Sequence, residues 1–183
     1  MLPLMTSVIP QFPGYQFVIA GVTNLPRELY APYQATYQMP VVFDAAYDLL
    51  SNADAALVTS GTATLETALF NVPQVVCYQA GAVTYTIAKW LIKVDYISLV
   101  NLIAEKEVVR ELIQQELTTE NLVAELKKIT TDALQRQHQL NEYARIKALL
   151  GKEGASEKAG TLMVNYLRAE NPGARREGRN YSL

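Results

Sequence analysis

Short apolar runs alternate with amphipathic segments along the first hundred residues of the chain. Five runs have the length and composition of buried strands, at 16–21, 40–43, 55–59, 74–78 and 96–99. Three segments between them are rich in helix-forming residues, at 45–52, 63–70 and 83–93, and Asp44 is expected to cap the first. Strands and helices that alternate at this spacing predict an α/β fold with a doubly wound parallel sheet and right-handed crossovers.

The remaining sequence predicts helices. We expect the end of a helix at 1–9, a helix at 105–115, a long helix capped by Thr118 or Thr119 and interrupted within 135–139, and a final helix at 156–167. These elements predict one Rossmann-like domain over 1–170. Residues 171–183 have three arginines and few apolar side chains, which predicts a tail that is disordered or foreign to the natural protein.

The composition is that of an ordinary globular protein. Half of the 183 residues are hydrophobic, and the net charge of -2 offers no general attraction for nucleic acid. The single cysteine, Cys77, lies in an apolar run and is interpreted as a core residue, while the single histidine, His138, is expected to be exposed. No Cys and His spacing predicts a zinc site, although a carboxylate-bound magnesium ion stays open. No apolar run reaches the roughly 20 residues of a membrane-spanning helix.

The tight corner Ser60-Gly61-Thr62 joins the predicted strand 55–59 to the predicted helix 63–70. At such a corner the N–H groups of the first helical turn and the helix dipole favour an anion. Gly61 would let a phosphate approach the backbone, and Glu66, one turn after Thr62, suits the two hydroxyls of a ribose. The corner is therefore a candidate site for a nucleotide.

The same residues also fit an ordinary helix start. Ser60 or Thr62 would then be the cap, and Glu66 an exposed acid near the positive end of the dipole. The setting between two apolar strands favours the binding site, because ligands of open α/β sheets bind outside the carboxyl ends of the strands.

Five blocks of sequence, in order, resemble the carboxy-terminal half of the lipid-A-disaccharide synthases. They are SGTATLE from Ser60, VPQVVCY from Val72, TYTIAKWLIKVDYISLVNLIA from Thr84, EVVRELIQ from Glu107 and GASEKA from Gly154. The resemblance extends from about Leu2 to Leu167. It implies the donor-binding half of a GT-B glycosyltransferase that acts in the cytoplasm, peripherally on the inner membrane.

The reaction that the resemblance implies belongs to lipid A biosynthesis. 2,3-diacylglucosamine is transferred from UDP to 2,3-diacylglucosamine 1-phosphate and UDP is released, without a cofactor or metal. By resemblance and position, Ser60, Gly61, Thr62 and Thr64 hold the diphosphate, Glu66 binds the ribose and Asn101 contacts the donor. Glu107 and Gln114 also match family positions, with a solvated helix face as the alternative. Tyr78 ends a predicted strand, where it could pack under a uracil or seal the sheet, and for Asn101 the alternative is a turn.

The chain departs from the family pattern in several ways. Such enzymes have two Rossmann-like domains, whereas this chain has room for only one, and that domain lacks its first strand. The general base is therefore expected in the other domain. Val100 replaces the usual proline, and Glu105-Lys106 replaces a glycine-arginine pair. A lysine is not equivalent to a bidentate arginine, and a diphosphate site would be weakened unless Lys106 takes over its role.

The segment 83–94 is predicted to be a helix with apolar residues around much of its circumference. Its residues Tyr85, Lys89, Trp90, Leu91 and Lys93 are candidates for membrane contact, with a core helix as the alternative. Helix 156–167 is a candidate for exchange with a second copy, which would make a homodimer. Two other functions stay open: another GT-B UDP-sugar enzyme, such as a 2-epimerase or the peptidoglycan N-acetylglucosaminyltransferase, and a non-catalytic fold fragment.

Overall fold

The computed structural model of the protein describes residues 1–59, 61–79, 96–151 and 154–170. The chain divides into two compact units, Met1–Leu149 and Leu150–Leu183. The prediction of one domain over 1–170 stays a prediction. The predicted helix at 83–93 and the tail after residue 170 lie outside the described residues.

The strands confirm the predicted α/β class. They are β1 (Ile19–Gly21), β2 (Val41–Phe43), β3 (Ala56–Thr59), β4 (Gln74–Tyr78) and β5 (Glu111–Ile113). All pairings are parallel: β1 pairs with β2, and β4 lies between β3 and β5 in a second sheet. The described strands therefore form a two-stranded and a three-stranded sheet.

Helices precede, connect and follow these strands. The α-helices are α1 (Leu2–Thr6), α2 (Ala31–Tyr37), α3 (Ala46–Asn52), α4 (Thr62–Leu69), α6 (Leu99–Ala104), α7 (Thr119–Thr131), α8 (Ala133–Leu150) and α9 (Ala155–Glu170). The described ranges also contain the 3₁₀ turns η1 (Ile9–Gln11), η2 (Arg27–Leu29) and η3 (Gln114–Glu116).

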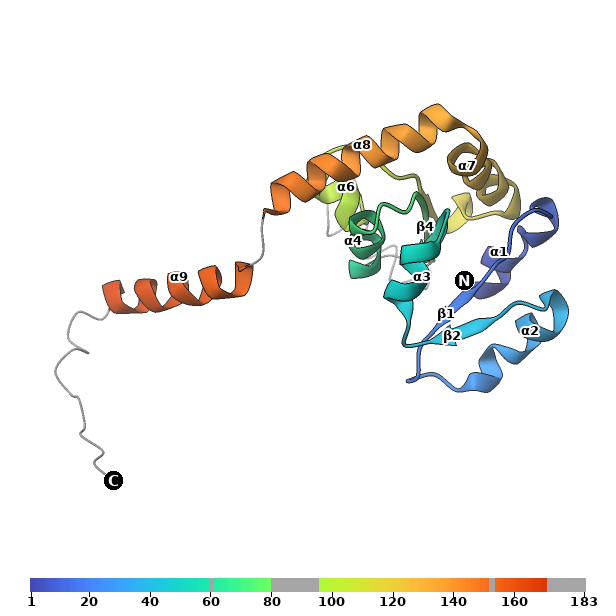
Figure 1. Ribbon diagram of the computed structural model, residues 1–183, viewed down its shortest axis with the longest axis horizontal. Coiled ribbons are helices and arrows are strands. Elements are labelled where there is room, and N and C mark those ends of the chain that lie inside the picture. Colours follow the sequence, from blue (N-terminus) through green and yellow to red (C-terminus); the bar gives the residue numbers. More distant parts are fainter. Residues whose placement is uncertain (60, 80–95, 152–153, 171–183) are drawn as a thin grey trace, which may run out of the picture. The chain divides into compact units, whose positions relative to one another are not determined.

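Successive residues of β4 point to two different cores, because side chains alternate along a strand. Val75 and Cys77 pack with Leu122, Leu126 and Ile129 of α7, and α1 borders this cluster. Val76 packs on the opposite face, in a cluster with Ala68 of α4, Val100 of α6, and Tyr143 and Ile146 of α8. The three-stranded sheet thus lies between two helical layers, with α4, α6 and α8 on one side and α7 on the other (Figure 1).

Two predicted elements after residue 95 are wrong. The expected strand at 96–99 is instead an irregular segment that leads to Ser98, the N-cap of α6, where the Ser98 hydroxyl accepts a hydrogen bond from the Asn101 N–H. The expected helix at 105–115 contains β5, because Val109 and Leu112 are buried and Glu111 makes tertiary hydrogen bonds. Tertiary contacts override the helix propensity of this stretch.

Two predicted helix ends also differ. The long helix is interrupted at Asp132 instead of within 135–139, because the Asp132 carboxylate accepts hydrogen bonds from the N–H groups of Leu134 and Gln135 and starts α8. Asp44 does not cap α3: its φ is 56° and its carboxylate accepts from the hydroxyl of Thr23.

Candidate functional site

The corner between β3 and α4 requires glycine. Gly61 is the N-cap of α4 with φ 115° and ψ -157°, a backbone conformation that is essentially restricted to glycine. A Cβ built at Gly61 would meet no atom within 4 Å, so the space beside this backbone is open. Ser60, which was predicted to share the site, lies outside the described residues.

The first turn of α4 offers free backbone donors. A glycine N-cap has no side chain to accept their hydrogen bonds, and in the described part of the chain no partner uses the N–H groups of Thr62 and Ala63. Thr62 is exposed. Because the first N–H groups of a helix lack intrahelical partners and carry the positive end of the dipole, an anion is favoured here.

Glu66 follows Thr62 by one helical turn and therefore lies on the same side of α4. Its side chain is half-buried, and among the described residues the carboxylate has no hydrogen-bond or ion-pair partner. Two acceptor oxygens to which no described residue donates are available to a ligand that carries hydroxyl groups.

Thr64 does not face this open side. It is fully buried, and its hydroxyl donates to the Gly61 carbonyl oxygen at 2.9 Å. The Thr64 side chain therefore does not point toward the place predicted for a diphosphate. It has a structural role, because its hydrogen bond to Gly61 stabilises the corner.

The other sequence candidates divide between the two edges of the sheet. Thr59, the last residue of β3, pairs with Cys77, and Tyr78, the last residue of β4, pairs with Ile113. Half-buried Tyr78 and Gln114, which follows β5 with φ 52°, therefore lie at the same carboxyl edge as the corner.

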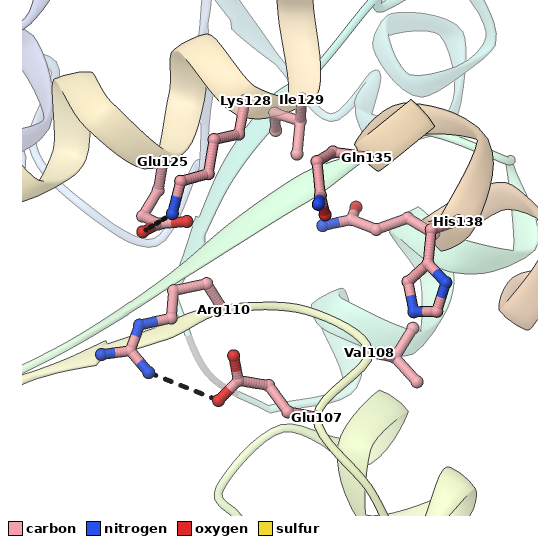
Figure 2. Close-up of a pocket in the computed structure, with 9 residues that line it drawn as sticks. Glu107, Val108, Arg110, Glu125, Lys128, Ile129, Gln135 and His138 are labelled. Carbon is pink, nitrogen blue, oxygen red and sulfur yellow. Dashed lines mark hydrogen bonds and ion pairs between the residues drawn. The ribbon is translucent and has the colours of Figure 1, made fainter. Parts of the chain in front are cut away.

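Glu107 lies at the opposite edge, because it comes before β5 instead of after it. There it pairs with Arg110 in a polar cleft of about 370 Å³ (Figure 2). Lys128, paired with Glu125, lies across the cleft, and exposed His138 of α8 borders it. The structure thus separates Glu107 from the candidate nucleotide site and confirms that His138 is exposed.

Asn101 is turned into the protein interior. Its amide nitrogen donates to the Val109 carbonyl at 2.8 Å and to the Glu111 carboxylate at 2.9 Å. Its amide oxygen accepts from the N–H groups of Val108 and Val109. Because both donors and both acceptor positions are used and the residue is fully buried, the Asn101 side chain has no group left for a ligand.

Glu111 is the centre of this buried network, and the sequence analysis missed it. Its carboxylate accepts hydrogen bonds from the N–H of Ile97 at 2.8 Å, the N–H of Ser98 at 2.9 Å and the hydroxyl of Ser98 at 2.7 Å, besides the Asn101 amide. These four donors fix the start of α6 against β5. The sequence does not indicate that Glu111 is buried, because Glu111 is a charged residue next to Arg110 in a stretch that was predicted to be helical.

Comparison with known proteins identifies the family. The sequence profile described as "Lipid-A-disaccharide synthetase" matches residues 7–164. The chain belongs to the lipid-A-disaccharide synthetase family.

Several members of this family are similar to the chain. The lipid-A-disaccharide synthase of Geobacter metallireducens is 36% identical over 159 residues, which are 86% of this chain and 41% of that protein. The synthase of Nitrosococcus oceani is 35% identical over 94% of this chain and 45% of its own length. The synthase of Psychromonas ingrahamii is 40% identical over 86% of this chain and 42% of its own length. The chain spans less than half the length of these curated relatives.

The three positions at which the sequence was expected to depart from the family have defined surroundings in the structure. Glu105, where the pattern has glycine, ends α6 with φ 52°, a left-handed conformation that glycine adopts more easily. Lys106, where the pattern has arginine, pairs with the Glu142 carboxylate of α8 at 2.8 Å. Val100 is fully buried in the core beneath α4. Lys106 thus has a structural partner, and the structure does not bring it to the Gly61 corner.

Glu142 links α6 and α8 and predicts a pH dependence of stability. The hydrogen bond from Lys106, with the charge of Arg145 at 2.6 Å, lowers the pKa of Glu142 below its ordinary 4.5. A carboxyl group whose pKa is lowered in the folded state stabilises the protein at pH values above its unfolded-state pKa. This contribution is lost as the pH falls through the folded-state pKa. Melting temperatures measured from pH 7 to pH 3 should therefore fall less steeply below about pH 4.5 in Glu142→Gln than in the unmodified chain. Parallel curves would contradict this assignment.

Two further sequence interpretations concern the core and the membrane. Cys77 is fully buried, and burial raises the pKa of its thiol to about 12, which confirms its interpretation as a core residue. Within the described ranges, none of the helices has the length and apolar character needed to cross a bilayer. The candidate membrane residues Tyr85, Lys89, Trp90, Leu91 and Lys93 lie outside the described residues.

Proposed function

We propose that the chain is the donor-binding part of a lipid-A-disaccharide synthase. The reaction transfers 2,3-diacylglucosamine from UDP to 2,3-diacylglucosamine 1-phosphate and releases UDP. The observation that carries the proposal is the corner of Gly61 and Thr62, with the free carboxylate of Glu66 one turn away, in a chain of this family. The diphosphate binds at the N–H groups of Thr62 and Ala63, and the ribose hydroxyls donate to Glu66.

The corner assists the reaction by stabilising the leaving group. Negative charge develops on the diphosphate as the bond to the sugar breaks, and groups that stabilise this charge lower the barrier. A helix terminus contributes roughly 0.3 to 2 kcal/mol, or at most about one to two powers of ten in rate. The rest must come from substrate positioning and from a general base, which we place in the part of the relatives' length that this chain does not span.

The acylated substrates imply contact with a membrane surface. We propose that the enzyme acts in the cytoplasm, peripherally on the inner membrane, and that Trp90 and Leu91 with the neighbouring lysines make this contact.

We also propose that the chain forms a homodimer through helix α9. Leu162, Met163, Tyr166 and Leu167 are spaced three to four residues apart on this helix and are 59% to 68% exposed. We propose that a second copy of the chain covers this apolar stripe.

The role of Glu66 is tested by binding of UDP. Calorimetry with the unmodified chain should detect UDP, and Glu66→Gln should bind it about tenfold more weakly, because the amide accepts less strongly than the carboxylate and has one oxygen fewer. Glu120→Gln, in the first turn of α7, is the matched control and should bind UDP as the unmodified chain does. If millimolar UDP gives no heat and no melting shift with the unmodified chain, the non-catalytic alternative applies to this chain.

A further inference from the structure

Gln74 begins β4 and is fully buried. The pairing of β4 with β5 starts only at Val76, so the backbone of Gln74 lacks a strand partner on that side. The Gln139 side chain of α8 takes the place of a strand: its amide oxygen accepts from the Gln74 N–H at 3.0 Å, and its amide nitrogen donates to the Gln74 carbonyl at 3.2 Å. Helix α8 is thereby fixed to the start of β4.

The Gln74 side chain continues this connection to the phosphate corner. Its amide nitrogen donates to the Thr64 carbonyl in the first turn of α4 at 2.8 Å. The Thr64 hydroxyl in turn donates to the Gly61 carbonyl at 2.9 Å. Two hydrogen bonds in series, the first buried and the second partly buried, therefore join Gln74 to the glycine at the open corner.

Tyr143 of α8 completes the network. Its hydroxyl donates to the Gln139 amide oxygen at 2.9 Å and lies 3.4 Å from the Gln74 amide nitrogen. Burial raises the pKa of Tyr143, so the hydroxyl keeps its proton and stays a hydrogen-bond donor.

Folding stability alone does not explain an amide at position 74. The Gln74 amide oxygen is buried, and no described group donates to it. A buried acceptor without a partner destabilises a protein, and methionine would fill nearly the same volume without a polar atom. The Gln74 side chain thus combines an oxygen that destabilises the protein with a nitrogen that hydrogen-bonds to the first turn of α4.

We propose that Gln74 is a positioning residue for the phosphate corner, held in place by Gln139 and Tyr143 of α8. It orients the first turn of α4 so that the N–H groups of Thr62 and Ala63 point together at the diphosphate. This inference rests on the proposed function, because it assigns Gln74 a role in the same nucleotide site. It also couples the position of α8 to the affinity for UDP.

Gln74→Met separates positioning from stability. The variant loses the amide nitrogen, which donates to the Thr64 carbonyl and to the Tyr143 hydroxyl, together with the amide oxygen, to which no described group donates. Its melting temperature without ligand should therefore stay close to that of the unmodified chain or rise. Its affinity for UDP should nevertheless be about three- to tenfold weaker, as expected for the loss of one neutral hydrogen bond. Tyr143→Phe, which removes a donor one step further away, should weaken UDP binding less.

Val75→Ala is the control for simple destabilisation. Val75 is the next residue of β4 and is fully buried in the core on the opposite face. This variant should melt at a lower temperature and bind UDP like the unmodified chain. If Gln74→Met binds UDP with unchanged affinity, or if Val75→Ala weakens binding as much as Gln74→Met does, the positioning role is overturned.

Amide hydrogen exchange tests the same inference without a ligand. In Gln74→Met, the amide of Thr64, which donates to the Gly61 carbonyl oxygen, should exchange faster than in the unmodified chain, while the amides of α7 should not change. Unchanged exchange in the first turn of α4 would overturn the inference. If the unmodified chain binds no UDP, only the proposed function fails for this chain, and the exchange measurement still decides whether Gln74 orders the corner.

Discussion

Glu111→Ala is expected to lower the free energy of unfolding by about 3–5 kcal/mol. The substitution removes the acceptor of four hydrogen bonds that Ile97, Ser98 and Asn101 donate, and it leaves these buried or partly buried donors without that acceptor. For a chain of this size the melting temperature should fall by roughly 6–20 °C. Urea unfolding followed by circular dichroism measures the change directly.

Two further variants test whether loss of the buried hydrogen-bond network causes the destabilisation by Glu111→Ala. Glu111→Gln keeps the shape and one acceptor oxygen but turns an NH₂ group toward a donor, so its effect should be intermediate. Glu116→Ala removes an exposed carboxylate that pairs with Arg110, and it should change the stability by less than about 1 kcal/mol. If Glu111→Ala were no more destabilising than Glu116→Ala, the network would not hold α6 against β5.

Gly61→Ala is expected to abolish measurable UDP binding and to lower the free energy of unfolding by about 1–3 kcal/mol. The reason is the backbone, because an alanine does not adopt φ 115° and ψ -157° without strain, and relaxation of the corner would turn the first-turn N–H groups away from the ligand. Calorimetric titration with UDP and thermal unfolding measure the two effects.

Gly151→Ala separates backbone strain from the binding site. Gly151 also has a positive φ, 78°, with no atom within 4 Å of its missing Cβ, and it follows α8 instead of β3. This variant should also be strained, because its residue 151 keeps a positive φ, but it should bind UDP with unchanged affinity. Retention of UDP binding by Gly61→Ala would show that the nucleotide does not depend on this corner.

The alternation of strands and helices could be predicted from the sequence up to β4, because local patterns determine it. The runs that became β3, α4 and β4 were predicted within one or two residues, since apolar β-branched residues and the Gly61 corner mark their ends. The region of β5 could not be predicted. Its sequence alternates charged and apolar residues in a way that also fits a helix, and the burial of Glu111 depends on donors 13 or 14 residues earlier in the chain.

The candidate site could be predicted in part for the same reason. Strand order brings Tyr78 and Gln114 to the edge where the Gly61 corner lies, and topology follows from the pattern of elements. Which way a polar side chain points depends on its tertiary neighbours. Thr64 and Asn101 turn inward because their side chains hydrogen-bond to backbone groups of Gly61, Val108 and Val109, and no motif in the sequence reveals those contacts.

A crystal structure of the chain with UDP is the most direct test of the nucleotide site. We predict diphosphate oxygens within hydrogen-bond distance of the N–H groups of Thr62 and Ala63, beside Gly61, and ribose hydroxyls on the Glu66 carboxylate. UDP bound elsewhere, for example in the polar cleft between Arg110 and His138, would contradict the proposed role of this corner.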